Sequence, residues 1–252
     1  MARKKVLVTG MNGLIGGVVR RQLEGEYDLS ALNRGEVAGV PCHRADIGDL
    51  DAIRPAFEGI DCVVHMAAVV TLAANLDDVV RTNVIGTYNV FEAAHRAGVG
   101  RVVYASSGAT IGNCELDEPY KAIAEGRYEE APESWPMLGI DAPIRPKGLY
   151  GCSKVWGEAL ARHYADTTPL SIICLRIGGV NKDDRPRSAR EYSIWCSQRD
   201  IARLVELSVQ APPDLKFDIF YGVSANRWSY RDVEHARRVI GWAPEDSAES
   251  YR

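Results

Sequence analysis

The sequence has no excess of basic residues and no long apolar segment. Its 30 lysines and arginines against 34 aspartates and glutamates give a formal net charge of -4, which offers no general attraction for nucleic acid or an anionic membrane. No stretch reaches the roughly 18 apolar residues that a membrane span needs, and the short apolar run near the start is typical of a strand, not of a signal peptide. We therefore expect a cytoplasmic protein without nucleic-acid or membrane partners.

Cysteine and histidine are too few and too scattered to suggest a metal centre. The six cysteines form no C-x-x-C pair, and the five histidines show no H-E-x-x-H or other paired spacing. Because zinc sites and redox dithiols depend on such spacings, we predict no metal site and no redox dithiol. The thiols are expected to be reduced and mostly buried.

What the sequence does contain is a regular alternation of short apolar runs with segments of helical period. This alternation is typical of βαβ units, and right-handed crossovers then give an α/β doubly wound Rossmann fold with a parallel sheet. We expect a single domain over residues 1–252. The predicted strands are Lys5–Thr9, Asp28–Leu32, Val40–Arg44, Cys62–His65, Arg101–Ala105, Leu170–Arg176 and Phe217–Phe220. The predicted helices are Leu14–Leu23, Leu50–Phe57, Asp77–Ala97, Tyr150–Tyr164, Arg199–Gln210 and Tyr230–Ile240.

Two segments interrupt this alternation. Residues 113–148, approximately, contain five prolines with mixed charges and aromatics, which indicates an irregular insertion. Asn181–Arg190 is a charged loop just after a predicted strand, where ligands of open α/β sheets usually bind. We expect substrate-binding elements within the small C-terminal portion, about 178–252.

A glycine-rich turn follows the first predicted strand. Residues 6–16 read VLVTGMNGLIG, with Gly10, Gly13 and Gly16 at the opening of a helix. Glycine there lets the backbone turn tightly and approach a pyrophosphate, and the helix N-terminus supplies free N–H donors. We therefore predict a dinucleotide site at this turn, to which the intervening Asn12, Leu14 and Ile15 contribute.

The end of the second strand leaves the choice of dinucleotide open. A carboxylate here would bind the adenosine ribose of NAD, but the sequence has Asn33 and Arg34. Asn33 can bond a ribose hydroxyl, whereas Arg34 can pair with the 2′-phosphate of NADP, stack on adenine or remain a solvated turn charge. Asp46, followed by Ile47, either bonds the adenine amino group or caps a helix.

Tyr150 and Lys154 form a Y-x-x-x-K pair at the start of a predicted helix. An i, i+4 spacing places both side chains on one helix face. An ammonium beside a phenol lowers the tyrosine pKa from about 10, so the phenolate can take a proton from an alcohol as hydride leaves. Alone the pair is a weak signal that also fits a surface pair; here it follows a glycine turn and a strand ending in YASS.

Taken in order, these motifs resemble the extended short-chain dehydrogenases/reductases of the NAD-dependent epimerase/dehydratase family, in particular the uronate dehydrogenase-like branch. The matching segments are TGMNGLIG (9–16), ADI (45–47), HMAA (65–68), NVIGT (83–87), YASSGATIG (104–112), YGCSK (150–154) and LRIG (175–178). They cover nearly the whole chain. The resemblance implies NAD as cofactor, with NADP as an alternative, and oxidation of a sugar or sugar-acid hydroxyl.

The resemblance also implies roles for individual residues. Tyr150 would be the general acid/base, and Lys154 would lower its pKa and hold the nicotinamide ribose. Ser107, rather than Ser106, would hydrogen-bond the reacting oxygen. Met66, Ala67, Ala68 and Ile177 would lie against the cofactor, and Gly108 against the substrate. Asn83 would be the family asparagine, for which a purely backbone-bonding role is an equal alternative.

For the substrate, the short C-terminal portion favours a free sugar or sugar acid over a nucleotide sugar. Arg190 aligns best as the arginine that binds a carboxylate, with Arg185 and Arg187 as alternatives and a solvated loop as the other interpretation. The sequence departs from uronate dehydrogenases at Val69, Val70, Gly108 and Ala109, where polar contacts are missing. The insertion can rebuild that side with Tyr120, Tyr128 or Trp135, so another sugar, a sugar phosphate or a sulfonated sugar stays open.

Two alternative functions stay open: a nucleotide-sugar epimerase/dehydratase with the same hydride chemistry, and a non-catalytic dinucleotide-binding module. The resemblance further suggests a homodimer through the helices 77–97 and 150–164.

Overall fold

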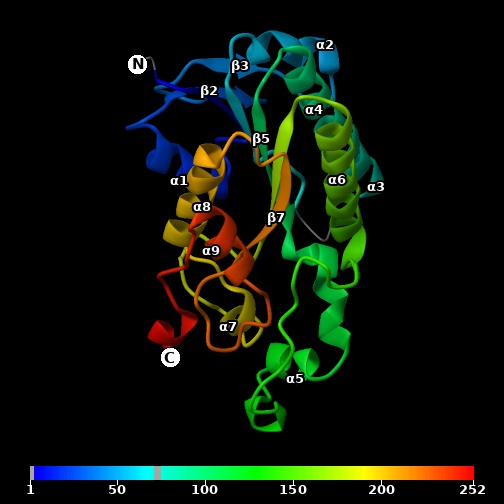
Figure 1. Cartoon of the computed structure of the whole chain (residues 1–252), viewed down its shortest axis with the longest axis vertical. Helices are drawn as coiled ribbons and strands as arrows, with labels where there is room; N and C mark the ends of the chain where they lie inside the picture. Colours follow the sequence, from blue (N-terminus) through cyan, green and yellow to red (C-terminus); the bar gives the residue numbers. More distant parts are fainter. Residues whose placement is uncertain (1–2, 71–74) are drawn as a thin grey trace.

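The structure is a computed structural model that describes residues 3–70 and 75–252. A parallel sheet crosses the molecule, with helices on both faces (Figure 1). Its strand order is β3-β2-β1-β4-β5-β6-β7. The bounds are β1 Lys5–Thr9, β2 Asp28–Asn33, β3 Cys42–Arg44, β4 Cys62–His65, β5 Arg101–Ser107, β6 Ser171–Ile177 and β7 Phe217–Gly222. The predicted doubly wound Rossmann fold is confirmed.

The central strands read as nearly continuous apolar runs because helices cover both of their faces. In Figure 1, α1 (Leu14–Leu23), α8 (Gln198–Gln210) and α9 (Glu234–Ile240) lie on one side of the sheet. The other side carries α2 (Leu50–Ile53), α3 (Leu76–Val79), α4 (Gly86–Arg96) and α6 (Gly148–Thr167). Each face has its own apolar core: Val19 and Leu204 belong to the first, Phe91 and Ala161 to the second.

Three predicted helices differ from the structure. The segment Asp77–Ala97 is not one regular helix, because a π-helical turn, Val80–Ile85, separates α3 from α4. Leu50–Phe57 divides into α2 and a 3-10 turn, Arg54–Phe57, where Pro55 has no N–H to continue the helix. Residues 230–233 precede α9 rather than belong to it, since the Tyr230 carbonyl accepts from Leu138 N (2.7 Å).

The insertion after β5 folds against the C-terminal portion. It contains a 3-10 helix, Gly108–Leu116, then α5 (Tyr120–Glu125) and a 3-10 turn, Tyr128–Glu130. These pieces occupy the lower end of the molecule in Figure 1, below the sheet. A third apolar cluster joins Ile111 and Ile123 of the insertion to Tyr221 and Tyr230. The insertion and the segment before α9 therefore form one packed region at the carboxyl end of the sheet.

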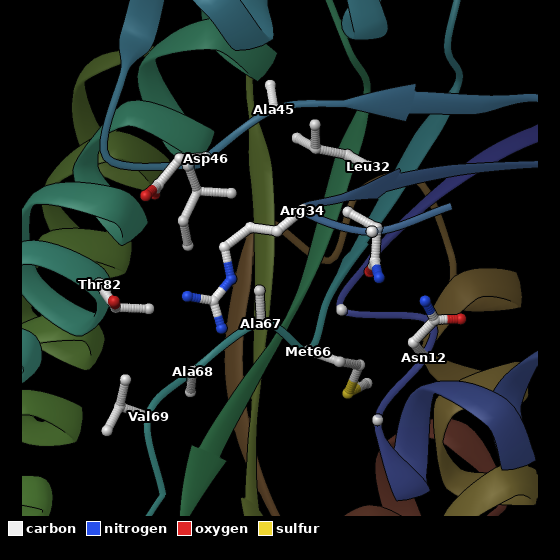
Figure 2. Close-up of a pocket in the computed structure, with 15 residues that line it drawn as sticks. Asn12, Leu32, Arg34, Ala45, Asp46, Met66, Ala67, Ala68, Val69 and Thr82 are labelled. Carbon is white, nitrogen blue, oxygen red and sulfur yellow. The ribbon is translucent and has the colours of Figure 1, made fainter. Parts of the chain in front are cut away.

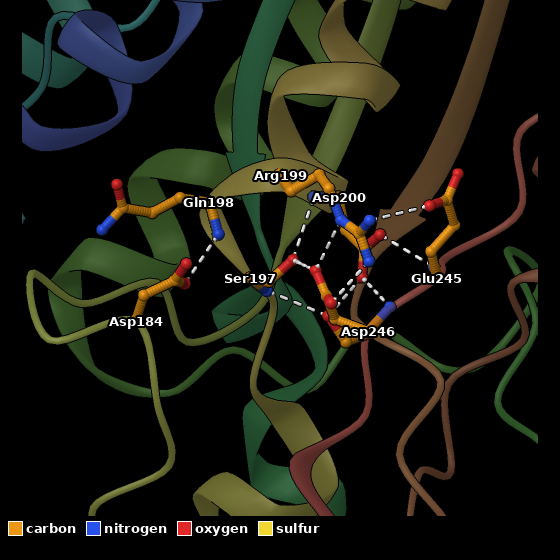
Figure 3. A network of polar contacts seen from close by, with 8 residues as sticks. Asp184, Ser197, Gln198, Arg199, Asp200, Glu245 and Asp246 are labelled. Carbon is orange, nitrogen blue, oxygen red and sulfur yellow. Dashed lines mark hydrogen bonds and ion pairs between the residues drawn. The ribbon is translucent and has the colours of Figure 1, made fainter. Parts of the chain in front are cut away.

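The end of the chain is fixed to α8 by a buried carboxylate, shown in Figure 3. Asp200, 2% exposed, accepts from Ser224 Oγ (2.6 Å) and from the backbone N–H groups of Glu245 (2.8 Å) and Asp246 (3.2 Å). Burial raises the pKa of Asp200, although these bonds favour its charged form. A short α7 (Glu191–Ile194) and a terminal 3-10 turn, Ala248–Tyr251, complete this region. That residues 1–252 form one domain stays a prediction.

None of the described helices combines the length and the apolar composition that crossing a bilayer requires.

Candidate active site

A cleft opens where the strand order reverses, between β1 and β4. Ligands of open α/β sheets bind at this point, beyond the carboxyl ends of the strands. Two cavities of about 410 Å³ and 380 Å³ lie here and share Gly10, Gly13, Met66 and Ala68 in their walls. The first reaches Asn33 and Arg34, and the second reaches Tyr150 and Lys154. Together they make one elongated site whose two ends are chemically different.

The glycine turn leaves no room for larger residues. Gly10 has φ 69°, and a Cβ there would lie 2.8 Å from the Ala67 backbone. A Cβ on Gly16 would overlap the Gly10 carbonyl oxygen and lie 2.7 Å from Met11 Cα. Gly13, the N-cap of α1, has no side-chain cap, so the first N–H groups of that helix remain available. Leu14 and Ile15 line the second cavity, and this geometry fits a pyrophosphate at the helix N-terminus.

At the far end of the first cavity the side chain of Asn33 has an unused acceptor. Its Oδ1 is buried without a hydrogen-bond partner, which is unfavourable unless a ligand supplies a donor. Arg34 extends its guanidinium into the cavity, toward Ala67 (Figure 2). Asn12 lines the same cavity while its Nδ2 donates to Glu36 O (2.9 Å). A ribose hydroxyl would satisfy Asn33, so these residues fit the adenosine half of a dinucleotide.

Asp46 lines this cavity but is not a helix cap. The cap of α2 is Asp49, whose side chain accepts from Ala52 N. Asp46 Oδ1 instead accepts from Gly48 N (2.8 Å), and Oδ2 accepts from Arg81 (3.1 Å). Ile47 lies beside it in the wall of the cavity. The carboxylate is thereby held at the adenine end, where its role stays a proposal.

The segment after β4 is held close to the glycine turn by a buried histidine. Ala67 N donates to Thr9 Oγ1 (3.1 Å), and the Thr9 hydroxyl is hydrogen-bonded to His65 Nδ1 (2.7 Å). The other ring nitrogen of His65, Nε2, is hydrogen-bonded to Thr87 Oγ1 (3.3 Å). Burial lowers the pKa of His65 to about 3. This network positions the residues after β4. Met66 and Ala68 line both cavities, and Ala67 lines the first.

Asn83 lies in the π-helical turn and uses its whole side chain within the protein. Its Oδ1 accepts from Val69 N (2.8 Å), and its Nδ2 donates to Val69 O (2.9 Å) and Ser153 Oγ (3.1 Å). It lines neither cavity of the cleft. These contacts favour the backbone-bonding alternative over direct cofactor contact. Asn83 ties the loop after β4 to the start of α6, where Tyr150 lies.

Tyr150, Lys154 and Ser107 meet at the other end of the cleft. All three line the second cavity, together with Ile177 at the end of β6. Lys154 is 2% exposed; its Nζ donates to Ala105 O (2.8 Å) and lies 5.6 Å from the Tyr150 ring centroid. The Ser107 hydroxyl accepts from Ala109 N (3.1 Å) and lies close enough to Tyr150 to lower the pKa of its phenol. A substrate hydroxyl entering this cavity would therefore find a phenol and a serine side by side.

The electrostatics of this group differ from the expectation that Lys154 lowers the tyrosine pKa. Burial raises the pKa of Tyr150, and Ser107 opposes that rise only in part. Burial also lowers the pKa of Lys154 to about 7, because the ammonium has lost most of its water. In the protein alone, desolvation therefore outweighs the attraction between ammonium and phenolate.

Ser106, the neighbour of Ser107, is committed to a different network. Its Oγ donates to Glu158 Oε1 (2.5 Å), and Glu158 forms a two-bond ion pair with Arg176 (3.0 and 2.9 Å). Arg176 also donates to Tyr221 OH (2.9 Å). This supports Ser107 as the serine that faces the substrate. Sequence analysis missed the pair, although Glu158 follows Lys154 by one helical turn and shares its buried face.

Arg190 does not offer a free guanidinium to a substrate. Its Nε and Nη2 donate to the two oxygens of Glu115 (2.6 and 2.8 Å), and it lines neither cavity of the cleft. Arg187 pairs with Asp183 (2.6 Å), and Arg185 is exposed. The carboxylate-binding role expected for this loop stays a prediction, but these contacts favour a structural role for Arg190, since its guanidinium is occupied by Glu115.

The aromatic residues of the insertion are also used elsewhere. Tyr120 OH donates to Pro136 O (2.9 Å), while Tyr128 and Trp135 stack on Trp228, with ring centroids 4.1 and 5.6 Å away. None of them lines the second cavity.

Next to Ser107, the space beside Gly108 is filled by the guanidinium of Arg231, another residue that sequence analysis missed. Within the described residues, no group of three His, Cys, Asp or Glu side chains is arranged to hold a metal ion.

Comparison with known proteins identifies the class. The model of the NAD dependent epimerase/dehydratase family matches residues 6–181, and the chain belongs to this family, as its motifs predicted. It is 34% identical over 254 residues to a uronate dehydrogenase of Agrobacterium fabrum, covering 99% of this chain and 87% of that enzyme. It is 31% identical over 256 residues to an NAD-dependent glucose-6-phosphate dehydrogenase of Haloferax volcanii, covering 98% and 95%.

Solved structures of relatives have the same fold. The crystal structure of uronate dehydrogenase from Agrobacterium tumefaciens superposes with a TM-score of 0.83 at 33% identity, covering 100% of this chain and 88% of that one. A mutant of that enzyme complexed with NAD gives a TM-score of 0.82 at 32% identity, with the same coverage. The present chain therefore shares its fold with a relative whose structure is a complex with NAD.

Proposed function

We propose that this protein is an NAD(P)-dependent dehydrogenase that oxidises a hydroxyl group of a sugar or sugar acid. The observation that carries the proposal is the layout of the cleft. The glycine turn and the unused acceptor of Asn33 lie at one end, and Ser107, Tyr150 and Lys154 lie at the other. Relatives named as uronate, glucose-6-phosphate and L-arabinose dehydrogenases, each at least 31% identical over nearly the whole chain, support the same chemistry.

Each residue has a part in this proposal. Gly10, Gly13 and Gly16 let the backbone receive the pyrophosphate, Asn33 and Asp46 bind the adenosine half, and Lys154 binds the nicotinamide ribose. The dinucleotide, when bound, supplies the hydride acceptor. Ser107 donates a hydrogen bond to the substrate oxygen, and Tyr150 removes its proton as the C–H bond breaks. The reaction then yields a carbonyl product, which for an anomeric hydroxyl is a lactone.

Without a bound cofactor, burial raises the pKa of Tyr150, so its phenol gives up its proton less readily. This limits its ability to take a proton from the substrate. A positive charge arriving beside the phenol favours the phenolate. The oxidised nicotinamide carries such a charge, so we propose that dinucleotide binding precedes and promotes deprotonation of Tyr150. NAD is the proposed cofactor, with NADP as the alternative that Arg34 would favour.

A spectrophotometric screen tests the function directly. The purified protein is mixed with NAD or NADP and a panel of uronates, aldoses and aldose phosphates, and the accumulation of reduced dinucleotide is followed. Steady accumulation with at least one sugar is the expected result. Conversion of a nucleotide sugar without net reduction would assign an epimerase instead. Dinucleotide binding without turnover on any sugar would leave a binding module.

We also propose a homodimer and a cytoplasmic location. Leu76, Val80, Ile85 and Tyr88 are exposed apolar side chains on the segment from α3 to α4, and Leu149 at the start of α6 is exposed as well. Burying such a face against a second copy would remove it from water. Sedimentation velocity would detect the dimer. The six cysteines are free thiols, which supports a reducing compartment.

A further inference from the structure

A buried cation without a hydrogen-bonded anion lies against Gly108, next to the substrate end of the cleft. Arg231 is 1% exposed, and its Nε and Nη1 have no hydrogen-bond partner. Its Nη2 makes one long contact, 3.5 Å, to Gly108 O. A buried guanidinium normally pairs with a carboxylate or a phosphate, because loss of water without such a partner is strongly unfavourable. The structure thus leaves Arg231 short of a negative group.

The position of this guanidinium is set by the residue after Ser107. A Cβ on Gly108 would lie 2.7 Å from both Cζ and Nη2 of Arg231. Glycine at 108 therefore allows the cation to approach the backbone directly beside the serine that faces the substrate. The backbone of Arg231 is fixed from the other direction, since Tyr230 O and Asp232 N bond Leu138 of the insertion (2.7 and 3.1 Å).

Glu115 interacts electrostatically with Arg231 but forms no hydrogen bond with it, because its oxygens are already used. Glu115 accepts from Arg190 (2.6 and 2.8 Å), from Tyr230 OH (2.6 Å) and from Lys147 (3.4 Å). Burial opposes its ionisation, yet Arg190 and Arg231 hold the pKa of Glu115 below its usual range. Three cations, Lys147, Arg190 and Arg231, therefore act on this one carboxylate.

We propose that Arg231 binds the anionic group of the substrate, a carboxylate or a phosphate, while the reacting hydroxyl lies at Ser107 and Tyr150. This inference rests on the proposed function and deepens it by assigning the substrate class: an acidic sugar rather than a neutral one. Arg190 then acts as a structural partner of Glu115. Arg231 lines a separate cavity of about 370 Å³, between Trp135 and Asn226, and meets the substrate end of the cleft through the contact of its guanidinium with Gly108.

The kinetic test uses three matched substrates: a neutral aldose, its 6-phosphate and the corresponding uronate. The two charged compounds separate phosphate from carboxylate recognition. In Arg231→Met, kcat/KM for the preferred acidic sugar should fall by at least about tenfold, the worth of a charge-assisted hydrogen bond. The value for the neutral aldose should change by less than about twofold. Arg231→Lys, which keeps the charge but loses the planar fork, should be intermediate.

Arg190→Met is the matched control, because it removes the same charge from the same cluster. It should affect the acidic and the neutral sugars alike, since its guanidinium serves Glu115. An equal loss on acidic and neutral sugars in Arg231→Met, or a selective loss only in Arg190→Met, would overturn the proposal.

A binding measurement keeps the proposal separate from the dehydrogenase activity. With saturating NAD present to occupy the glycine turn, inorganic phosphate should raise the melting temperature of the wild-type protein and of Arg190→Met, but not that of Arg231→Met. The same rise in all three proteins would contradict the assignment even if sugars are oxidised. Conversely, phosphate protection lost only in Arg231→Met, without turnover of any sugar, would refute the dehydrogenase and retain the anion site.

Discussion

The two ends of the cleft are built in opposite ways. The dinucleotide end is made of backbone and small residues: Gly10, Gly16 and Ala67 pack so closely that added atoms would overlap. The substrate end, at Ser107 and Tyr150, is bordered by a cluster of long charged side chains, Glu115, Arg190 and Arg231, which reach one another from distant segments. The first end is therefore specified by shape and the second by charge. Substitutions should have different signatures at the two ends, and four predictions use this contrast.

The largest effect is expected at Tyr150, at the substrate end of the cleft. Tyr150→Phe removes the oxygen that takes the substrate proton but leaves the walls of the cleft in place. Turnover should fall by about 100-fold or more, the range of general acid–base catalysis, while the dissociation constant for NAD stays within about twofold. Steady-state kinetics and fluorescence titration measure the two quantities.

Tyr164→Phe is the matched control for this prediction. It makes the same change on the same helix, but the Tyr164 hydroxyl donates to Glu92 (2.6 Å) and lines neither cavity of the cleft. Its turnover should remain close to wild type. If Tyr150→Phe retained wild-type turnover, Tyr150 would have no role in proton transfer.

The next effect tests shape at the dinucleotide end. In Gly16→Ala the new methyl group would lie 2.7 Å from Met11 Cα and overlap the Gly10 carbonyl, so the glycine turn must shift. Overpacking of this kind costs about 1–3 kcal/mol, and NAD affinity should fall by roughly 5- to 100-fold. In Gly17→Ala the nearest atoms are 3.8 and 3.9 Å away, ordinary contacts. Isothermal titration should find unchanged affinity there; equal losses in both variants would remove the steric argument.

The same contrast explains which parts of the molecule the sequence could predict. Strands and the glycine turn depend on local periodicity and on motifs within a few residues, and β1 and β4 have the predicted bounds. Tyr150 and Lys154 lie one helical turn apart, so their shared face also follows from local geometry.

The charged end could not be predicted in this way. Arg190 and Glu115 are 75 positions apart, and Arg231 and Gly108 are 123 positions apart. Such pairs depend on how the insertion packs against the C-terminal portion, which no local pattern encodes. The π-helical turn at Val80–Ile85 has a similar origin, because Asn83 there bonds Val69 and Ser153. Arg190 looked like a free cation in sequence because its partner lies in a different segment.

A third prediction concerns a buried group that fixes the dinucleotide end. Burial lowers the pKa of His65 to about 3, whereas in the unfolded chain it is about 6.5. The unfolded state therefore takes up a proton first as pH falls. The stability contributed by neutral His65 is complete above pH 6.5 and is lost progressively down to about pH 3, amounting to about 2 kcal/mol at pH 5.

Urea denaturation at about pH 7.5 and pH 5 checks this value. His65→Gln, which has no titrating ring, should lose about 2 kcal/mol less between the two pH values than the wild type does. His163→Gln, at an exposed position, should behave like the wild type. If His65→Gln kept the full acid sensitivity, another group would be responsible.

The smallest effect is expected at Arg34, the one long charged side chain that we propose for cofactor choice at the dinucleotide end. Arg34 is exposed, although its guanidinium extends into the first cavity (Figure 2). A pair with the 2′-phosphate of NADP would therefore be screened by water, like other surface pairs, and worth about 0.2–1 kcal/mol. Arg34→Ala should weaken NADP binding by up to about fivefold and leave NAD binding unchanged.

Arg44→Ala removes a nearby exposed cation outside that cavity and should affect neither dinucleotide. Since salt screens exposed charges, the loss in Arg34→Ala should shrink at high ionic strength. A salt-independent loss that is equal for NAD and NADP would instead mean that Arg34 contributes to the shape of the cavity, as the glycines do. The division between a shape-specified end and a charge-specified end would then hold for every residue of the cleft.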